Sequence, residues 1–263
     1  MKERLISAFV ALLIIIPLLV LGGIYFDILV IVLGLLGLKE LLDLKKDIPN
    51  FVKYVSYVLF LILLIYGYTY TGKIFLMNYT FLIICLLILL SSLLVFRNKK
   101  YSIDDVFYLF ASIIFLSSAF HLFTVVRAKS LMITIYLILI TTMTDTFAFM
   151  IGRKYGKNKL MRDISPNKTI EGFVAGSIIG PIIACLFYYF LINKANVLII
   201  ILVTIFLSIV GQIGDLVFSS IKRHFKIKDF SNIMPGHGGI LDRLDSIIFV
   251  LFAYIVISAI FVL

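Results

Sequence analysis

The segment 196–218, NVLIIILVTIFLSIVGQIGDLVF, is apolar over almost its whole length and holds one ionisable residue, Asp215. A helix that crosses a membrane needs roughly 20 consecutive apolar residues, because the hydrocarbon core of a bilayer is about 30 Å thick. Similar blocks fill most of this chain of 263 residues, of which 62% are hydrophobic. Soluble domains are only about 45–50% apolar. The sequence therefore predicts an all-α polytopic integral membrane protein.

Nine apolar segments are candidates for membrane spans. The segment 28–44 is the shortest of the early ones, and it ends in the polar stretch LKELLDLKK. The first apolar run follows Met-Lys-Glu-Arg without a small-x-small cleavage site, so we interpret it as a span rather than a signal peptide. The predicted spans are about 5–25, 28–44, 51–71, 75–96, 105–126, 130–151, 173–193, 196–218 and 246–263.

The basic residues predict how these spans are oriented. Cytoplasmic loops of membrane proteins carry an excess of Lys and Arg. With a cytoplasmic N-terminus and nine spans, the 24 basic residues divide 20 to 4 in favour of the cytoplasmic side. The four on the other side are Lys73, Arg127, Lys129 and Lys194. This bias supports nine spans, an N-terminus inside and a location in the cytoplasmic membrane.

The net charge of +10 does not point to nucleic acid in this context. The basic residues lie between apolar blocks, where membrane topology and anionic lipid headgroups explain them. The two longest polar connections, 152–172 and 219–245, both fall on the predicted cytoplasmic side. We therefore expect N-terminal transmembrane helices in 1–129 and a catalytic half in 130–263, with a polar site at the cytoplasmic interface.

Ionisable residues within spans are candidates for function, because burying them in a membrane is costly. Asp145 and Asp215 lie near the cytoplasmic ends of two spans, although an interfacial salt bridge is the alternative for each. Asp215, Ser219, Lys222 and Arg223 share one helix face at 3.6 residues per turn. At the start of the last span, Asp242 and Asp245 lie one turn apart. An aspartate near a helix N-terminus is also an ordinary capping residue.

Two polar stretches could bind phosphate. In PGHGG, residues 235–239, glycines permit the tight turns in which backbone N–H groups cradle anions, and His237 can donate to phosphate. A plain Pro-Gly turn is the alternative. The stretch SPNKTIEG, residues 165–172, is either part of an anion site or a basic loop beside anionic lipid. It is not a P-loop, because GxxxxGK followed by Ser or Thr is absent.

The stretch 219–245 resembles the signature of the phosphatidate cytidylyltransferase (CDP-diacylglycerol synthase) family. The family's Ser, Lys-Arg, Lys-Asp, His-Gly-Gly and Asp-Arg-x-Asp appear here as SSIKRHFKIKDFSNIMPGHGGILDRLD, with Met234 where Leu, Ile or Phe is usual. TDTFAFMIGRKYGKNKL and SPNKTIEGF also look like family segments, with Phe147 where Gly or Ala is common. The resemblance covers roughly 130–263. The first 130 residues match only in hydropathy and in KELLDL.

The resemblance implies that CTP and phosphatidic acid react to CDP-diacylglycerol and pyrophosphate. Carboxylates at the positions of Asp215 and Asp242 would hold Mg²⁺, which prefers one or two carboxylates plus phosphate oxygens, and K⁺ is a candidate second ion. The attacking phosphate is already ionised, so metals and fixed cations are the expected catalytic groups. Those cations are Lys222, Arg223, Lys228 and Arg243.

The remaining candidates are assigned to substrate binding. They are Ser219, His237, Gly238 and Gly239 on the nucleotide side, and Asp145, Ser165, Asn167, Lys168, Thr169 and Glu171 on the lipid side. Expected partners are CTP, phosphatidic acid, membrane lipid and a second copy in a homodimer. The alternatives are a polyprenol kinase, an archaeal-lipid cytidylyltransferase or, from another class, an ion-coupled transporter. A transporter would carry its charges near mid-membrane in matching halves, whereas here they cluster at one face.

Overall fold

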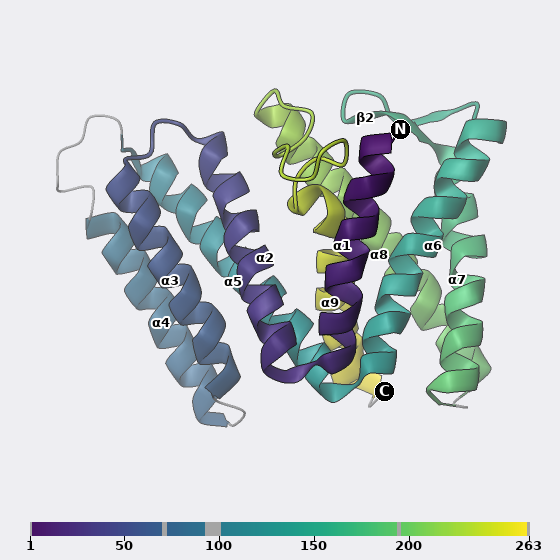
Figure 1. Cartoon of the computed structure of the whole chain (residues 1–263), viewed down its shortest axis with the longest axis horizontal. Helices are drawn as coiled ribbons and strands as arrows, with labels where there is room; N and C mark the ends of the chain where they lie inside the picture. The colour runs from purple at the N-terminus through teal and green to yellow at the C-terminus, as the bar shows by residue number, and fades with distance from the viewer. Residues whose placement is uncertain (1, 70–72, 93–100, 194–195, 262–263) are drawn as a thin grey trace. The chain divides into compact units, whose positions relative to one another are not determined.

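The structure is a computed structural model that describes residues 2–69, 73–92, 101–193 and 196–261 (Figure 1). Within these residues the chain forms nine helices and a two-stranded hairpin. It divides into two compact units, Met1–Thr124 with Phe230–Ile240, and Val125–Asp229 with Leu241–Leu263. The elements are α1 (Lys2–Leu21), α2 (Gly23–Leu44), α3 (Asn50–Thr69), α4 (Lys73–Ser92), α5 (Ile103–Lys129), α6 (Leu131–Tyr155), β1 (Lys159–Met161), β2 (Ser165–Thr169), α7 (Ile170–Leu191), α8 (Val197–His224) and α9 (Leu241–Phe261).

Each of the nine predicted apolar segments corresponds to one helix, which confirms an all-α membrane protein. Among the described residues, the five helices α5 to α9 are long and apolar enough to cross a membrane. The remaining spans of the predicted nine stay predictions. Some residues behind the topology argument lie outside the described part of the chain, namely Arg97, Lys99, Lys100, Lys194 and the ends of segments 51–71, 75–96 and 246–263.

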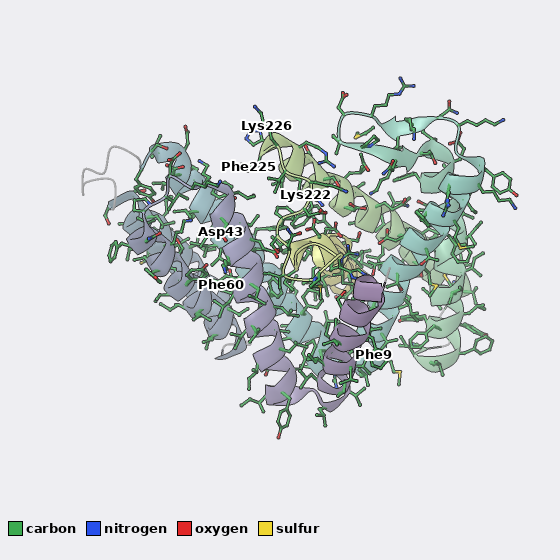
Figure 2. The ribbon with its side chains drawn as sticks, turned by 45° about the horizontal axis from the view of Figure 1, so that its top comes forward. Phe9, Asp43, Phe60, Lys222, Phe225 and Lys226 are labelled. Atoms are coloured by element: carbon green, nitrogen blue, oxygen red, sulfur yellow. The ribbon has the colours of Figure 1, made fainter. Side chains whose placement is uncertain are left out.

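Large apolar side chains cover the outside of several helices, as expected where lipid replaces water. Phe9 on α1, which Figure 2 labels, is 67% exposed, and Phe190 on α7 is equally exposed. In a soluble protein such faces would favour aggregation, whereas lipid is as apolar as they are. The distribution of exposed side chains therefore agrees with the membrane class inferred from composition.

The second unit is held together by a close approach of α6 and α7, which Figure 1 shows side by side. Gly172, Gly176 and Gly180 recur at intervals of four and so share one face of α7. A Cβ atom at Gly176 would lie 2.8 Å from the carbonyl oxygen of Thr144, and one at Gly180 would lie 2.7 Å from the Thr144 nitrogen. Small residues at every fourth position let helix backbones pack closely in membranes.

Polar side chains fix α8 against its neighbours in the second unit. Thr204, Ser208 and Gln212 lie at intervals of four along α8, and all three are buried. The Ser208 and Thr144 hydroxyls are 2.7 Å apart, and Gln212 Nε2 donates to Ser177 Oγ of α7 at 2.8 Å. Buried polar groups need such partners in an apolar medium. The stripe continues toward the C-terminal end of α8 into the residues of the candidate site.

The connection 152–172 contains an antiparallel hairpin that the sequence analysis did not foresee. Lys159 of β1 pairs with Thr169 of β2, and Met161 pairs with Ser165. The strands are only three and five residues long and are mostly polar and exposed. They lack the apolar alternation by which half-buried strands are found, so the expectation of a purely helical chain missed them.

The first unit relies on aromatic and aliphatic packing. A Cβ atom at Gly34 of α2 would lie 2.8 Å from Phe60 Cζ and 3.2 Å from Phe120 Cγ, so α2 packs closely on rings from α3 and α5. At the end of α2, the Lys45 ammonium lies 2.6 Å from the Asp105 carboxylate in the first turn of α5. The segment 230–240 belongs to this unit, although the sequence analysis placed all of 130–263 together.

Candidate active site

A cavity of about 720 Å³ opens in the second unit. Its size lies within the range of about 300–1,000 Å³ that is usual for small-molecule sites. Residues of α6, the hairpin, α7, α8 and the start of α9 line it. Eight of the predicted site residues line this cavity, namely Asp145, Asn167, Lys168, Thr169, Asp215, Lys222, Asp242 and Arg243.

The predicted stripe on α8 forms one wall of the site. Ser219 Oγ donates to Asp215 Oδ1 at 3.3 Å, as the four-residue spacing predicted. Lys222 follows on the same face and is buried. Figure 2 shows it at the C-terminal end of α8, where Lys226 also lies. The helix therefore carries a carboxylate, a hydroxyl and an ammonium group toward its end.

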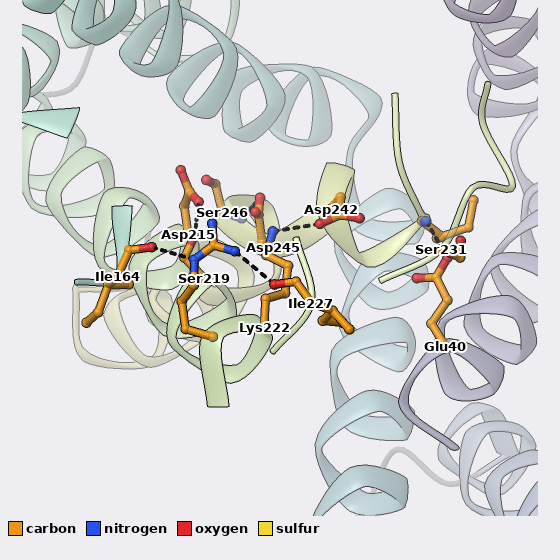
Figure 3. A network of polar contacts seen from close by, with 12 residues as sticks. Glu40, Ile164, Asp215, Ser219, Lys222, Ile227, Ser231, Asp242, Asp245 and Ser246 are labelled. Atoms are coloured by element: carbon orange, nitrogen blue, oxygen red, sulfur yellow. Dashed lines mark hydrogen bonds and ion pairs between the residues drawn. The ribbon is translucent and has the colours of Figure 1, made fainter. Parts of the chain in front are cut away.

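Two ion pairs cross the cavity region. Lys168 of β2 donates to Asp215 of α8. Lys222 of α8 donates to Asp242 in the first turn of α9, with 2.6 Å between the nitrogen and oxygen (Figure 3). The side chains of Lys222 and Asp242 are only 10% and 4% exposed. Both carboxylates proposed as metal ligands thus have a lysine beside them in this structure.

Two further carboxylates share this environment. Asp145 of α6 interacts electrostatically with Asp215 and Lys168, and Asp245 of α9 with Asp215, Lys222 and Asp145. Asp245 also accepts a hydrogen bond from the Ser246 backbone nitrogen at 2.8 Å. Counting all lining residues, the cavity has five aspartates and five basic side chains: Asp145, Asp215, Asp229, Asp242 and Asp245, with Arg153, Lys159, Lys168, Lys222 and Arg243.

The start of α7 explains how the hairpin presents Lys168. Thr169 is the N-cap of α7, and its Oγ1 accepts from Gly172 N at 3.1 Å. A Cβ atom at Gly156, the C-cap of α6, would lie 2.7 Å from Thr169 Oγ1. The two helix ends therefore meet at Thr169, which leaves Asn167 and Lys168 just before it to line the cavity.

Several predicted residues of the second unit do not line the cavity. Arg223 donates to the carbonyl oxygens of Ile164 and Ile227, at 3.1 Å and 2.8 Å (Figure 3). Glu171 accepts from the backbone and side-chain nitrogens of Asn158, so it fastens the entry to the hairpin. Ser165, Ser219 and Lys228 are also absent from the cavity lining.

The glycine-rich stretch belongs to the first unit and is not part of the cavity lining. His237 N donates to Met234 O at 2.8 Å across a turn with Pro235 second and Gly236 third. Gly236 has φ 76°, as the third position of a type II turn requires. Gly238 also has a positive φ of 83°. The predicted turn is therefore present, with glycine where left-handed backbone occurs.

Five polar or charged cavity residues were not among the predicted site residues: Arg153, Lys159, Gln212, Asp229 and Asp245. Two of them had a usable signal. Asp245 is one turn from Asp242 on the same helix, and Gln212 is an amide inside an otherwise apolar run. Arg153 and Lys159 look like ordinary topology charges in the sequence. Only the fold brings them beside the aspartates.

The donor set fits a hard divalent cation. Among the described residues, no three His, Cys, Asp or Glu side chains form a ready metal cage. Mg²⁺ does not need one, because it binds through one or two carboxylates plus phosphate oxygens and keeps several waters. Asp215 and Asp242 supply two carboxylates that line one cavity. These two residues are the ones that could hold the metal once substrate phosphates are present.

Comparison with known proteins gives a consistent result. Residues 2–261 match the cytidylyltransferase family. A phosphatidate cytidylyltransferase of Staphylococcus haemolyticus (strain JCSC1435) is 40% identical over 251 residues, which cover 95% of this chain and 96% of the relative. One of Staphylococcus aureus (strain COL) is 38% identical over 95% and 96% of the two chains. One of Bacillus subtilis (strain 168) is 34% identical over 98% of both.

Proposed function

Since this chain belongs to the cytidylyltransferase family, we propose that it converts CTP and phosphatidic acid to CDP-diacylglycerol and pyrophosphate. A phosphate oxygen of phosphatidic acid attacks the α-phosphorus of CTP and forms a new P–O bond. The bond from the α-phosphorus to the bridging oxygen breaks, and pyrophosphate leaves with its electron pair. The observation that carries this proposal is the cavity lined by five aspartates and five basic side chains.

The charges of the cavity suit this reaction. A phosphate monoester is mostly doubly ionised near pH 7, because its second pKa is about 6, so no general base is required. The barrier is electrostatic, since two polyanions must meet. Five aspartates balance five basic side chains in the lining. The aspartates therefore offset the basic charge of the lining, and added cations would help the site to accept both substrates.

Lys168 and Lys222 have a defined part in this scheme. In the ligand-free chain their ammonium groups neutralise Asp215 and Asp242. When nucleotide and metal bind together, we expect the lysines to turn to phosphate oxygens while the carboxylates turn to the metal. The ion pairs give each carboxylate a partner of opposite charge before substrate arrives, since a charge buried alone would be costly. Arg243, which also lines the cavity, is the expected further phosphate ligand.

Asp215 and Asp242 would hold Mg²⁺, and K⁺ is the candidate for a second ion. When bound, such ions neutralise charge that develops on the transferring and leaving phosphates. The protein's own residues orient the substrates: Lys168, Lys222 and Arg243 bind phosphate oxygens, and Asn167 and Thr169 offer polar groups for the lipid headgroup. Arg223, Lys228, His237, Gly238 and Gly239 stay predicted phosphate ligands from the family signature.

The membrane arrangement is part of the proposal. Nine spans with a cytoplasmic N-terminus place the cavity at the cytoplasmic face, where CTP is available. The 20 to 4 division of basic residues supports this orientation. The acyl chains of phosphatidic acid remain in lipid while its headgroup enters the site. A homodimer also stays a prediction.

The reaction can be tested with purified protein in mixed detergent micelles. Labelled CTP is supplied with phosphatidic acid, and CDP-diacylglycerol and pyrophosphate are quantified with Mg²⁺ or with EDTA. We expect product with phosphatidic acid and Mg²⁺, and none with EDTA. Polyprenol or an archaeal-type lipid phosphate replaces phosphatidic acid in parallel reactions. Product formed only from one of these lipids would reject the proposed substrate.

The metal assignment has its own variant. Asp242→Asn keeps the shape of the side chain but removes its charge, and we expect kcat to fall about 10²–10³-fold, as when other transition-state stabilising groups are removed. Asp43→Asn is the matched control, since Asp43 is an exposed carboxylate of α2 whose nearest cation is Lys53 at 3.7 Å. A folded Asp242→Asn protein with full activity would reject the metal role and leave the reaction intact.

A further inference from the structure

Glu40 is a buried carboxylate that the proposed chemistry does not use. It lies one turn before the end of α2 and is only 2% exposed. Its helix neighbours Leu38, Leu41 and Leu42 are buried as well. A carboxylate in apolar surroundings costs free energy unless it accepts hydrogen bonds. The hydrogen-bond donors that contact Glu40 therefore indicate which part of the chain it holds in place.

The carboxylate binds both ends of one loop. Glu40 Oε1 accepts from Ser231 Oγ at 2.6 Å and from the Ile240 backbone nitrogen at 2.8 Å. Figure 3 shows Glu40 beside Ser231. Ser231 and Ile240 bound the segment that contains PGHGG. A single oxygen atom thus closes this segment at its base.

The shape of the loop fits this arrangement. Gly239 approaches so closely that a Cβ atom there would overlap the Glu40 carboxylate. Within the loop, Met234 N donates to Gly238 O at 3.0 Å. The type II turn inside it can form from its local Pro-Gly sequence. The distance between the two ends of the segment is not set locally, and Glu40 supplies that constraint.

Helix α1 makes a second tie to the same loop. Ser7 Oγ donates to the Pro235 carbonyl oxygen at 3.0 Å, and it lies 2.8 Å from His237 Nδ1. Two N-terminal helices therefore hold this loop. For Ser7 of α1, the loop follows more than 220 positions later in the chain. The N-terminal helices thus have a role beyond forming membrane spans.

We propose that Glu40 is a positioning residue that clamps the segment 231–240 at both ends and so fixes the backbone of PGHGG for binding nucleotide phosphate. The assignment to nucleotide rests on the proposed function, whereas the clamp itself rests on the hydrogen bonds of the first unit. The bonds from Ser231 and Ile240 share one Glu40 oxygen as the acceptor, and both donors are neutral. An amide oxygen can accept in the same way, so Gln is expected to replace Glu where Ala does not.

The first measurement is hydrogen exchange at the Ile240 amide in full-length protein. We compare wild type, Glu40→Gln and Glu40→Ala, with Asp43→Asn as a control from the next turn of the same helix. Loss of the acceptor should speed exchange at Ile240 at least about tenfold in Glu40→Ala. Glu40→Gln and Asp43→Asn should exchange like wild type. Unchanged exchange in Glu40→Ala would reject the clamp, whatever reaction the protein performs.

The second measurement separates positioning from general destabilisation. For Glu40→Ala we expect the KM for CTP to rise about tenfold, with the KM for phosphatidic acid within about twofold of wild type. Glu40→Gln should restore the KM for CTP. An equal loss in kcat and both KM values, without rescue by Gln, would mean that Glu40 only stabilises the fold and would overturn the proposal.

Two safeguards keep these outcomes separable. If Glu40→Ala does not fold, Ser231→Ala removes one arm of the clamp while Glu40 stays in place, and faster Ile240 exchange with a raised KM for CTP is again expected. No change in either quantity for Ser231→Ala would then count against the clamp. If wild type forms no CDP-diacylglycerol, the proposed function fails, while the exchange experiment still decides the clamp.

Discussion

The two units of this protein use carboxylates in opposite ways. In the second unit, Asp215 and Asp242 face the ammonium groups of Lys168 and Lys222 beside an open cavity. In the first unit, Glu40 accepts from a hydroxyl and a backbone amide at the base of a loop. One arrangement pairs full charges, and the other uses an oxygen as an anchor for neutral donors.

This difference separates groups that can change partners from groups that cannot. Under the proposed mechanism, a lysine that leaves a carboxylate would meet a phosphate oxygen and the carboxylate would meet a metal ion, so each group would keep a partner of opposite charge. A backbone N–H that leaves an acceptor inside the protein has no such substitute, and an unsatisfied buried donor costs about 1–3 kcal/mol. The ion pairs of the cavity are therefore suited to changing partners during a reaction cycle. The hydrogen bonds of the Glu40 clamp are suited to staying in place.

The largest expected effect tests the exchangeable pair. Lys222→Met leaves Asp242 buried without this cation, and breaking a buried pair costs about 3–5 kcal/mol. We expect a fall in Tm of about 10 °C in detergent, together with loss of CDP-diacylglycerol synthesis. Adding Asp242→Asn to Lys222→Met should recover much of the Tm, because Asp242 then no longer carries an unpaired charge.

Activity should not return in that double variant, since the proposed phosphate ligand Lys222 and the proposed metal ligand Asp242 are both gone. The thermal measurement and the assay thus separate the structural role of the pair from its chemical role. Recovery of activity with stability would show that the pair serves folding alone, and the contrast with Glu40 would disappear.

An intermediate effect compares the helix packing of the two units. Gly176→Ala places a methyl group 2.8 Å from a backbone oxygen of α6, which cannot move alone, whereas Gly34→Ala meets the tip of the Phe60 ring. Overpacking typically costs about 1–3 kcal/mol, and Ala offsets up to about 1 kcal/mol by helix propensity. We expect a lower Tm for Gly176→Ala and little change for Gly34→Ala. Equal shifts would show that backbone contact does not distinguish the units.

The smallest effect concerns the buried hydroxyl pair of the second unit. Ser208→Ala removes the partner of Thr144, which lies 2.7 Å away. Hydrogen bonds between membrane helices contribute about 0.6 kcal/mol on average, so the Tm should fall by no more than a few degrees. A loss as large as that of Lys222→Met would mean that this hydroxyl pair contributes as much to stability as a buried ion pair.

Much of the fold follows from hydropathy, because every long apolar block became a helix. Hydropathy did not predict the secondary structure of the short connections between these blocks. The hairpin at Lys159–Met161 and Ser165–Thr169 is built from two strands of three and five residues, too short and too mixed in polarity for a periodic signal. Its position depends on Thr169, which caps α7 and contacts Gly156. Such a meeting of two helix ends leaves no periodic pattern in the sequence.

The candidate site was predictable to the extent that it uses local spacing. Asp215 and Ser219 share a helix face because they are four residues apart, and the hydrogen bond between them follows. The Lys222–Asp242 pair spans 20 positions across a loop, so spacing could not foresee it. The role of Glu40 had no local signal in the sequence, since its partners are 191 and 200 positions away.

The long separation between Glu40 and Ser231 has a consequence for how the chain is made. A ribosome adds about 5–20 residues per second, so the 191 positions between them take about 10–40 s to synthesise. During that time α2 exists without the hydroxyl and amide that later bind its carboxylate. The first unit is therefore begun early and completed late in synthesis. A chain that stops before residue 230 carries an acidic group that the finished protein covers, and a quality-control system could recognise it by that group.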